Sequence, residues 1–347
     1  MEEKVTYVGL DVHPETTFAV WGRPHEPVKR LEFPTTEEGF RILNRRIGRQ
    51  GLWAAYEASS CGFVPYEILR KMGWAVSIVP PTHLPRSLKR QKNKADPKDA
   101  EAMRDVVMAH GELGTEMAEV AIPDPELRDD RELTRQRLQL GEKISAVKAG
   151  VLQLLRRHGV DRPKTIKSRW TKAHVAWLRG LDGAHSPIPP GARQVMASQL
   201  RMLDFLEKEK EAMDKALDEL SRKPRYAGAV GRMRRHKGVG LLTAMVLLLE
   251  MGNPGRFRNR RQVGSFFGLV PSRRDSGNQV NHLGHITRLG SSRARKALNQ
   301  AAWAFLRTHD KWKAWFKRLA GRRGKKRAVV ALMRKLAIIL WHEAVAA

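Results

Sequence analysis

The chain has 347 residues, 41% of them hydrophobic and 29% charged, so it is long enough for two or three domains and apolar enough to form a core. Lys and Arg number 65 against 36 Asp and Glu, and the net charge of +29 predicts a polyanionic partner such as nucleic acid. The single cysteine excludes internal disulfides and cysteine-based zinc sites, and no apolar run, lipidation motif or signal peptide indicates a membrane.

Hydrophobic periodicity predicts a β-meander at the start of the chain, followed by alternating helices and strands. The predicted strands are 5–12, 17–21, 28–33, 52–56 and 74–79, and the predicted helices are 35–49, 64–72 and 94–110. This order, β-β-β-α-β-α-β-α, is typical of an RNase H-like domain, in which helices pack on a mixed sheet. We assign residues 1–115 to it.

The middle of the chain predicts two long helices, at 129–158 and 193–222, whose apolar residues recur every three or four positions. Mixed charges opposite these stripes indicate a helical hairpin or coiled coil, which we place at 125–225. The stripe of the first helix includes Ile144, Val147, Val151, Leu154 and His158. Between the helices, the basic, Pro-rich stretch 162–190 is interpreted as a functional loop, because it is long for a simple connector.

A third, mostly helical domain is predicted at 230–347. It begins with an apolar helix at 241–250 and continues with a loop region rich in Gly and Arg, 252–290. Three basic helices follow, at 291–307, 312–319 and 325–343. The predicted fold class of the whole chain is therefore α/β plus α.

Four carboxylates are the candidate catalytic and metal-binding residues: Asp11 near the end of the first strand, Glu57 at the end of the fourth, and Asp96 and Asp99 at the start of a helix that Pro97 favours. In an RNase H-like sheet these positions converge. Clustered carboxylates repel one another unless a hard cation neutralises them, which predicts Mg²⁺ or Mn²⁺. Taken singly, an Asp at a strand end is more often a cap or turn residue.

These residues stand in segments that resemble a known family. YVGLDVH (7–13), YEASS (56–60) and KADPKDA (94–100) are similar to the DEDD motif of insertion-sequence transposases of the one-ten type. Later segments are similar to the C-terminal transposase domain of that family: 238–240, 268–271 and 275–277. The resemblance covers nearly the whole chain. Ala95 departs from it, since the family usually has Thr there.

The resemblance implies a RuvC-like domain, a coiled-coil arm for dimerisation and a C-terminal domain with a nucleophilic serine. It also implies a structured non-coding guide RNA that pairs with donor and target DNA. The expected protein is a homo-oligomeric DNA recombinase, dimer or tetramer, in the cytoplasm of a prokaryote and associated with the nucleoid. It would exchange DNA strands through a phosphoserine intermediate with the aid of Mg²⁺.

Ser276, in Asp275-Ser276-Gly277, is the candidate nucleophile, and Ser272 is the alternative. A Ser-Gly pair by itself is an ordinary turn signal, so the assignment rests on the matched surroundings. Two other functions are compatible with the residues. One is a metal-only RuvC-like nuclease or junction resolvase with an incidental serine, and the other is a non-enzymatic nucleic-acid-binding scaffold with structural acids.

The predicted nucleic-acid contacts combine Lys and Arg clusters with one glycine turn. Gly238-Val239-Gly240, ahead of a helix, resembles a helix-hairpin-helix turn whose backbone N–H groups meet a phosphate, although a turn that packs helices together fits as well. Arg side chains suit phosphate oxygens. The predicted contacts are Lys94, Lys98, Lys237, Gly238, Gly240, Arg256, Arg273, Arg274, Arg322, Arg323, Lys325 and Lys326.

Overall fold

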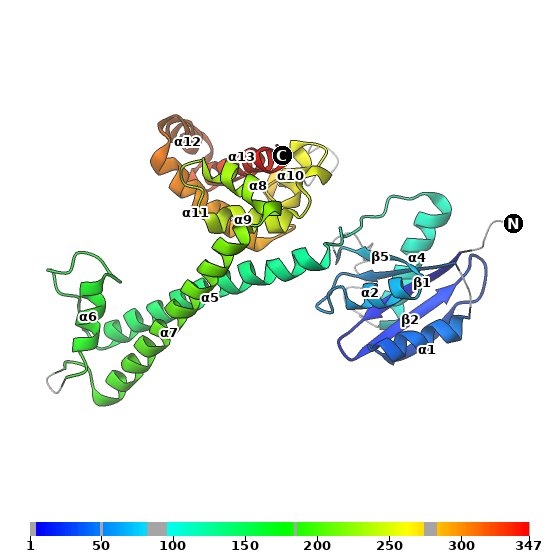
Figure 1. Ribbon diagram of the computed structural model, residues 1–347, viewed down its shortest axis with the longest axis horizontal. Helices are drawn as coiled ribbons and strands as arrows, with labels where there is room; N and C mark the ends of the chain where they lie inside the picture. The colour runs from blue at the N-terminus through cyan, green and yellow to red at the C-terminus, as the bar shows by residue number, and fades with distance from the viewer. Residues whose placement is uncertain (1–4, 49–50, 82–95, 184–185, 274–282, 347) are drawn as a thin grey trace. The chain divides into compact units, whose positions relative to one another are not determined.

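The chain divides into two compact units, residues 1–122 and 123–347. The computed structural model describes residues 5–48, 51–81, 96–183, 186–273 and 283–346 (Figure 1). The boundary between the units falls between the first and second predicted domains. The further division of the second unit near residue 228 stays a prediction. None of the described helices has the length and apolar character that crossing a membrane requires.

A mixed sheet forms the centre of the first unit. Its strands are β1 (Thr6–Val12), β2 (Thr16–Gly22), β3 (Lys29–Pro34), β4 (Leu52–Glu57) and β5 (Ala75–Val79), in the order β3-β2-β1-β4-β5. The pairs β1–β2 and β2–β3 are antiparallel, whereas β4 runs parallel to both β1 and β5. Each strand lies within two residues of its predicted place.

Helices cover both faces of this sheet because side chains of a strand alternate between its faces. Val8 and Leu10 of β1 pack in one cluster with Phe40 of α1 (Glu37–Ile47) and Leu69 of α2 (Val64–Lys71). Tyr7 packs in another cluster, with Met103 and Val107 of α4 (Asp96–Leu113). The first helix starts where Thr36 accepts a hydrogen bond from the N–H of Gly39.

The second unit begins with a long antiparallel hairpin, α5 (Pro125–Arg157) and α7 (Pro190–Ser221). Ion pairs join Arg137 to Asp214 and Lys148 to Glu207, which fixes the opposite directions of the two helices. Buried leucines and an isoleucine fill the seam: Leu140, Ile144, Leu203 and Leu206. His158 was predicted in this stripe, but it is exposed because it is the C-cap residue, where the chain leaves the helix.

Three helices were not predicted. The supposed loop 162–190 contains α6 (Lys172–Gly180), which Thr171 caps by accepting from the N–H of His174. The supposed loop 252–290 contains α10 (Arg260–Phe266), capped by Asn259, together with a short 3₁₀ turn, η2 (Pro254–Arg256), and two strands, β6 (Pro271–Arg273) and β7 (Leu283–Ile286). Helix α8 (Pro224–Arg234) spans the predicted boundary between the second and third domains.

A nearly all-apolar helix, α9 (Leu241–Met251), is the centre of the remaining core, since all residues from Ala244 to Leu249 are buried. It packs in one cluster with α8, α11 (Ser292–Thr308) and α13 (Lys325–Val345), to which α12 (Asp310–Arg323) adds the buried ring of Phe316. Arg131 of α5 joins the hairpin to this core, because its guanidinium donates to the backbone oxygens of Leu249 and Glu250.

Candidate nucleic-acid-processing site

Asp11 and Glu57 lie on neighbouring parallel strands at the carboxyl ends of β1 and β4. The register runs from Thr6 opposite Leu52 to Leu10 opposite Tyr56, so the next pair along is Asp11 and Glu57. Neighbouring strands lie ~4.8 Å apart and paired residues point to the same face. The two carboxylates therefore share one face and one edge of the sheet. Both residues are half-buried, and the Asp11 side chain is 18% exposed.

Helix α4 lies directly on that face because β1 has a glycine at its centre. A Cβ atom on Gly9 would lie 1.9 Å from the backbone oxygen of Ala100 and 2.3 Å from the backbone nitrogen of Arg104. Gly9 and Asp11 are two residues apart, and so they point to the same face. The start of α4 and the carboxylate of Asp11 thus lie on one side of the sheet.

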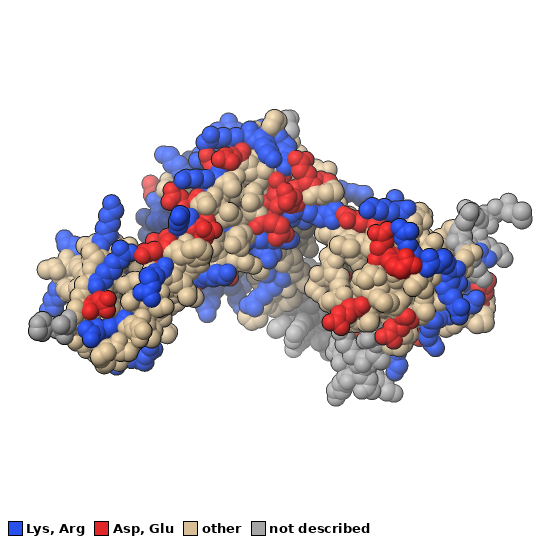
Figure 2. Space-filling view, turned by 60° about the horizontal axis from the view of Figure 1, so that its bottom comes forward, with Lys and Arg blue, Asp and Glu red and all other residues tan. Residues whose placement is uncertain are grey.

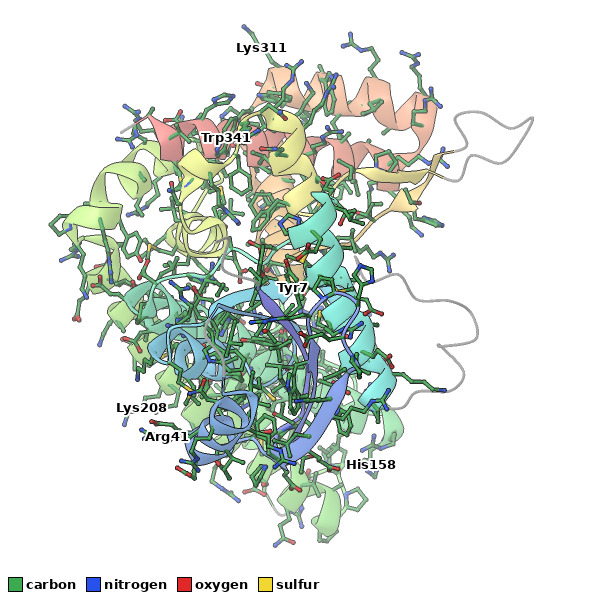
Figure 3. The ribbon with its side chains drawn as sticks, turned by 90° about the vertical axis from the view of Figure 1, so that its right-hand side faces the viewer. Tyr7, Arg41, His158, Lys208, Lys311 and Trp341 are labelled. Atoms are coloured by element: carbon green, nitrogen blue, oxygen red, sulfur yellow. The ribbon has the colours of Figure 1, made fainter. Side chains whose placement is uncertain are left out.

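The direction of α4 follows from Tyr7, at the other end of β1. Its hydroxyl (Tyr7 is labelled in Figure 3) donates to Glu112 Oε1 at 2.7 Å, near the end of the helix. The helix therefore runs antiparallel to β1, and its first turn lies at the Asp11 end. From Gly9 to Asp11 the strand advances about 6.6 Å, the rise of about four helical residues. Measured along the strand, Asp11 therefore lies next to the first turn of α4, which contains Asp99.

The predicted metal ligands are thus partly described. The side chain of Asp96, the first residue of α4, lies outside the described residues. Among the side chains that are described, no group of three or more His, Cys, Asp and Glu is gathered as metal ligands would be. The donor chemistry of Asp11, Glu57 and Asp99 fits a hard cation, since all three offer carboxylate oxygens. His13, not predicted as a ligand, places Nε2 3.2 Å from Asp11 Oδ2.

Ser276 and Arg274 lie in residues 274–282, between β6 and β7, and outside the described residues. The alternative nucleophile, Ser272, is described in β6. Its hydroxyl donates to the backbone oxygen of His285 at 3.0 Å, across the antiparallel pair. That hydrogen bond uses the proton of Ser272 to join the two strands, which argues against a nucleophilic role.

Of the two roles that the sequence left open for the turn 237–240, the structure shows the packing role, and the phosphate contact stays a prediction. Gly238 has φ +98°, and a Cβ there would lie 2.6 Å from the backbone nitrogen of Phe305, so this glycine lets the turn pack on α11. Gly240 is exposed, and a Cβ there would meet nothing within 4 Å. Lys237 is exposed beside it. Gly238 is therefore the glycine that packing requires, whereas the backbone at Gly240 is open to solvent.

The other predicted cationic contacts are mostly exposed. Arg256 lies over the rings of Phe257 and Phe266, 4.7 and 4.8 Å from their centroids. The end of α12 and the start of α13 carry Arg322, Arg323, Lys325 and Lys326, all exposed, and Lys98 is exposed in the first turn of α4. The side chain of Arg273, and Lys94 as a whole, lie outside the described residues.

Two family models match the chain. One, for DEDD transposases of the IS110 type, matches residues 8–159, and the other, for transposases of the IS116/IS110/IS902 family, matches residues 231–317. The Sinorhizobium fredii protein y4rJ, described as a transposase, is 32% identical over 82% of this chain and 75% of its own length. The chain belongs to the IS116/IS110/IS902 transposase family. The expected class of enzyme, a DNA transposase, is thereby confirmed.

More distant relatives of this transposase cover similar lengths. The transposase of insertion sequence element IS1533 from Leptospira borgpetersenii is 27% identical over 87% of the chain and 86% of its own length. That of element IS1111A from Coxiella burnetii is 28% identical over 80% of the chain and 73% of its own length. Both matches extend well beyond either family model.

The sequence did not predict a role for Arg295 of the transposase. This side chain links the segment before β6 to the segment after β7. Its Nη1 donates to the backbone oxygens of Phe267, Leu289 and Gly290, at 3.3, 3.2 and 3.0 Å. These carbonyls belong to the segments that enter β6 and leave β7. A lone Arg in a helix full of cations carries no signal of this role, because its acceptors are backbone atoms.

Proposed function

We propose that this transposase cuts and rejoins DNA by transesterification, with Ser276 as the nucleophile and Asp11, Glu57, Asp96 and Asp99 as ligands of Mg²⁺ or Mn²⁺. The proposal is carried by the edge of the sheet at which Asp11 and Glu57 are neighbours on the face that α4 covers. Like charges this close are costly unless a cation or a proton neutralises them.

The proposed reaction conserves phosphodiester bonds. The Ser276 oxygen attacks phosphorus, an Oγ–P bond forms, and the bond from phosphorus to one DNA oxygen breaks. The serine proton passes to a base, and the leaving oxygen gains a proton. A hydroxyl of another DNA end then attacks the phosphoserine, which restores the serine and joins the strands. A bound divalent cation would supply charge stabilisation on the phosphate oxygens.

The finer architecture is part of the same proposal. The strand order and the helices on both faces support an RNase H-like, RuvC-type domain at 1–115. The antiparallel pair α5 and α7 supports a coiled-coil arm at 125–225, and the single core around α9 supports a C-terminal transposase domain at 230–347. These boundaries predict where limited proteolysis of the protein cuts.

We further propose donor DNA, target DNA and a structured guide RNA as partners of a homo-oligomer, dimer or tetramer, in the cytoplasm of a prokaryote, at the nucleoid. A net charge of +29 supports polyanionic partners. The guide RNA rests on the family resemblance, and sequencing of RNA that copurifies with the protein tests it directly.

The decisive experiment on the chemistry is denaturing electrophoresis of protein incubated with labelled DNA bearing the ends of its own element. Wild type with Mg²⁺ is expected to form a covalent protein–DNA adduct. Ser276→Ala is expected to abolish the adduct, whereas Ser272→Ala retains it. Asp11→Asn is expected to lower adduct formation at least about a hundredfold, the usual scale for losing preorganised charge stabilisation.

The same experiment separates transesterification from metal-only hydrolysis. A metal-only nuclease would cleave DNA in Ser276→Ala and would leave no adduct with wild type. Free cleaved ends in both proteins would therefore overturn the assignment of Ser276 while leaving the four acids in place.

A further inference from the structure

The closed end of the hairpin α5/α7 carries a dense group of positive charges. Residues 156–172 contain seven Lys and Arg and one acid, Asp161. We call residues 156–183 the hairpin tip. Six cations between residues 156 and 172 are exposed to solvent: Arg156, Arg157, Lys164, Lys167, Arg169 and Lys172. At the left-hand end of Figure 2, which α6 and the adjoining ends of α5 and α7 form, several groups of Lys and Arg stand among uncharged residues and a few acids.

A hydrophobic core stabilises the fold of the hairpin tip, and so it limits the freedom of the backbone that carries the cations. Apolar side chains from all three helices form one buried cluster: Val151, Leu154, Leu155, Leu178, Met196 and Leu200. Trp170 and Trp177 pack against it. Arg179 of α6 also pairs with Asp204 of α7 at 2.7 Å. Fixed cations lose less conformational entropy on binding than cations on a flexible loop.

In the described part of the chain, no carboxylate pairs with the six exposed cations between residues 156 and 172. Among the described residues, none of the six forms an ion pair, and only Arg179 of the tip has an acidic partner. Two further nitrogen atoms, Arg162 Nη1 and His174 Nε2, are buried without a hydrogen-bond partner in the described part of the chain. Burial, and then the charges of Arg162 and Arg169, lower the pKa of His174. The exposed, unpaired cations thus give the tip a positive charge that attracts anions.

The packing of the aromatic rings in the tip favours a phosphate backbone over the stacked bases of a single strand. Proteins that bind single strands offer free ring faces on which bases stack. Here Trp170 meets His174 edge-on at 5.4 Å, and Lys148 covers its ring at 5.3 Å. Trp177 is packed against His174 at 5.5 Å. The exposed surface therefore offers Lys and Arg for phosphates, with few ring faces for bases.

We propose that the hairpin tip binds the phosphate backbone of duplex DNA, without reading its sequence. Phosphate contacts position a protein on a duplex and carry no sequence information directly. The proposal rests on the proposed function only in taking DNA as the substrate. It adds a contact remote in sequence from the four acids and from the serine.

The test compares two variants that lose the same charge. Lys164→Gln, Lys167→Gln and Lys172→Gln together neutralise the tip, and Lys143→Gln, Lys208→Gln and Lys215→Gln together neutralise the shaft of the same hairpin (Lys208 is labelled in Figure 3). All six lysines are exposed, so both variants should fold. Fluorescence anisotropy of a long mixed-sequence DNA duplex gives the affinity of each at several salt concentrations.

The tip variant is expected to bind DNA more weakly and with a shallower salt dependence. The slope of log K against log salt is negative, and each lost phosphate contact reduces its magnitude by about 0.9, so three lost contacts reduce it by about 2 to 3. The shaft variant should keep the wild-type slope. A tip variant with the wild-type or shaft slope would overturn the proposal, and so would a change seen only with an RNA duplex of equal length.

The DNA binding of the tip can be tested separately from the proposed chemistry of Ser276. At saturating DNA the tip variant is expected to form the covalent adduct as wild type does. If wild type forms no adduct but the tip variant still loses salt-dependent binding, the serine chemistry fails and the DNA contact stands.

Discussion

At Gly9 the backbone of helix α4 packs directly on β1, and so this glycine helps to set the distance between Asp11 and the first turn of that helix. We predict that Gly9→Ala destabilises the first unit by about 3 kcal/mol, the upper end for an overpacked core, because the added Cβ would meet backbone atoms that cannot move aside. Denaturant titration of the full chain measures this.

Gly22→Ala, on the neighbouring strand β2, is the matched control for Gly9→Ala. A Cβ there would lie 3.6 Å from its nearest neighbour, an ordinary contact. If the two variants unfold at the same denaturant concentration, the packing of α4 on β1 does not require a glycine at position 9.

Tyr7 gives the first unit a measurable dependence on high pH. Burial, and then the hydrogen bond to Glu112, raise the pKa of Tyr7 to about 12. The unfolded chain loses this proton near pH 10, so between pH 10 and about 12 only the folded state keeps it. Stability from this group is complete below pH 10 and falls as pH rises, by at most ~1.4 kcal/mol per pH unit.

We therefore expect Tyr7→Phe to show a shallower loss of stability than wild type above pH 10. Guanidinium unfolding of both proteins at several alkaline pH values measures the difference. Tyr66→Phe, on α2, controls for the loss of a phenol and should follow wild type. Parallel curves for Tyr7→Phe and wild type would contradict the assignment.

Sequence patterns predicted the strands and long helices well because each has a strong periodic signal. The alternation in β1 and the steps of three and four in α5 and α7 repeat often enough to fix the type of element. Helix α8 was missed because Pro224, Gly228 and Gly231 are typical of a linker. What stabilises it is tertiary: Tyr226, Val230 and Met233 are all buried on one side. Short helices α6 and α10 depend likewise on caps and packing.

Of the candidate site, the positions of Asp11 and Glu57 at two strand ends could be predicted from sequence alone. Their shared face could not, since it depends on the register of β1 with β4, which the pairing of distant segments sets. The hydrogen bonds of Arg295 could not be predicted from the sequence either, because the three acceptors are backbone carbonyls that only folding brings together.

Helix α7 has an apolar face that the hairpin does not cover. Val195, Met202 and Phe205 are 48, 52 and 61% exposed, and their spacing of seven and three places them on one side of the helix. Since we propose a homo-oligomer, we expect this face to pack against a second copy of the chain. Met202→Glu with Phe205→Glu should shift the protein toward the monomer in sedimentation velocity.

These two positions lie outside the buried stripe of Leu200, Leu203 and Leu206, so the variant should keep its thermal stability as a monomer. Arg201→Glu with Lys208→Glu alters the charge of the same helix at exposed polar positions and is the control. An unchanged sedimentation coefficient for the apolar variant, together with a changed one for the control, would place the oligomer interface elsewhere.

The two units have separate cores, one around Leu10 and Phe40 and the other around α9, and so heating the full chain should produce two calorimetric transitions. A ligand that binds only one folded unit raises only that unit's midpoint. Because all four proposed metal ligands belong to the first unit, Mn²⁺ should raise one transition alone. At a hundredfold excess over Kd the stabilisation is about 2.7 kcal/mol, which is several degrees.

Asp11→Asn should remove this Mn²⁺ shift, and Glu15→Gln should keep it, since Glu15 is an exposed carboxylate of the same unit beyond the end of β1. Calorimetry with and without Mn²⁺ on the three proteins measures the site in the absence of DNA and of any reaction. A shift of both transitions, or an equal shift in Asp11→Asn, would mean that the ion binds elsewhere. The sheet edge would then lose its proposed role, whatever the behaviour of Ser276.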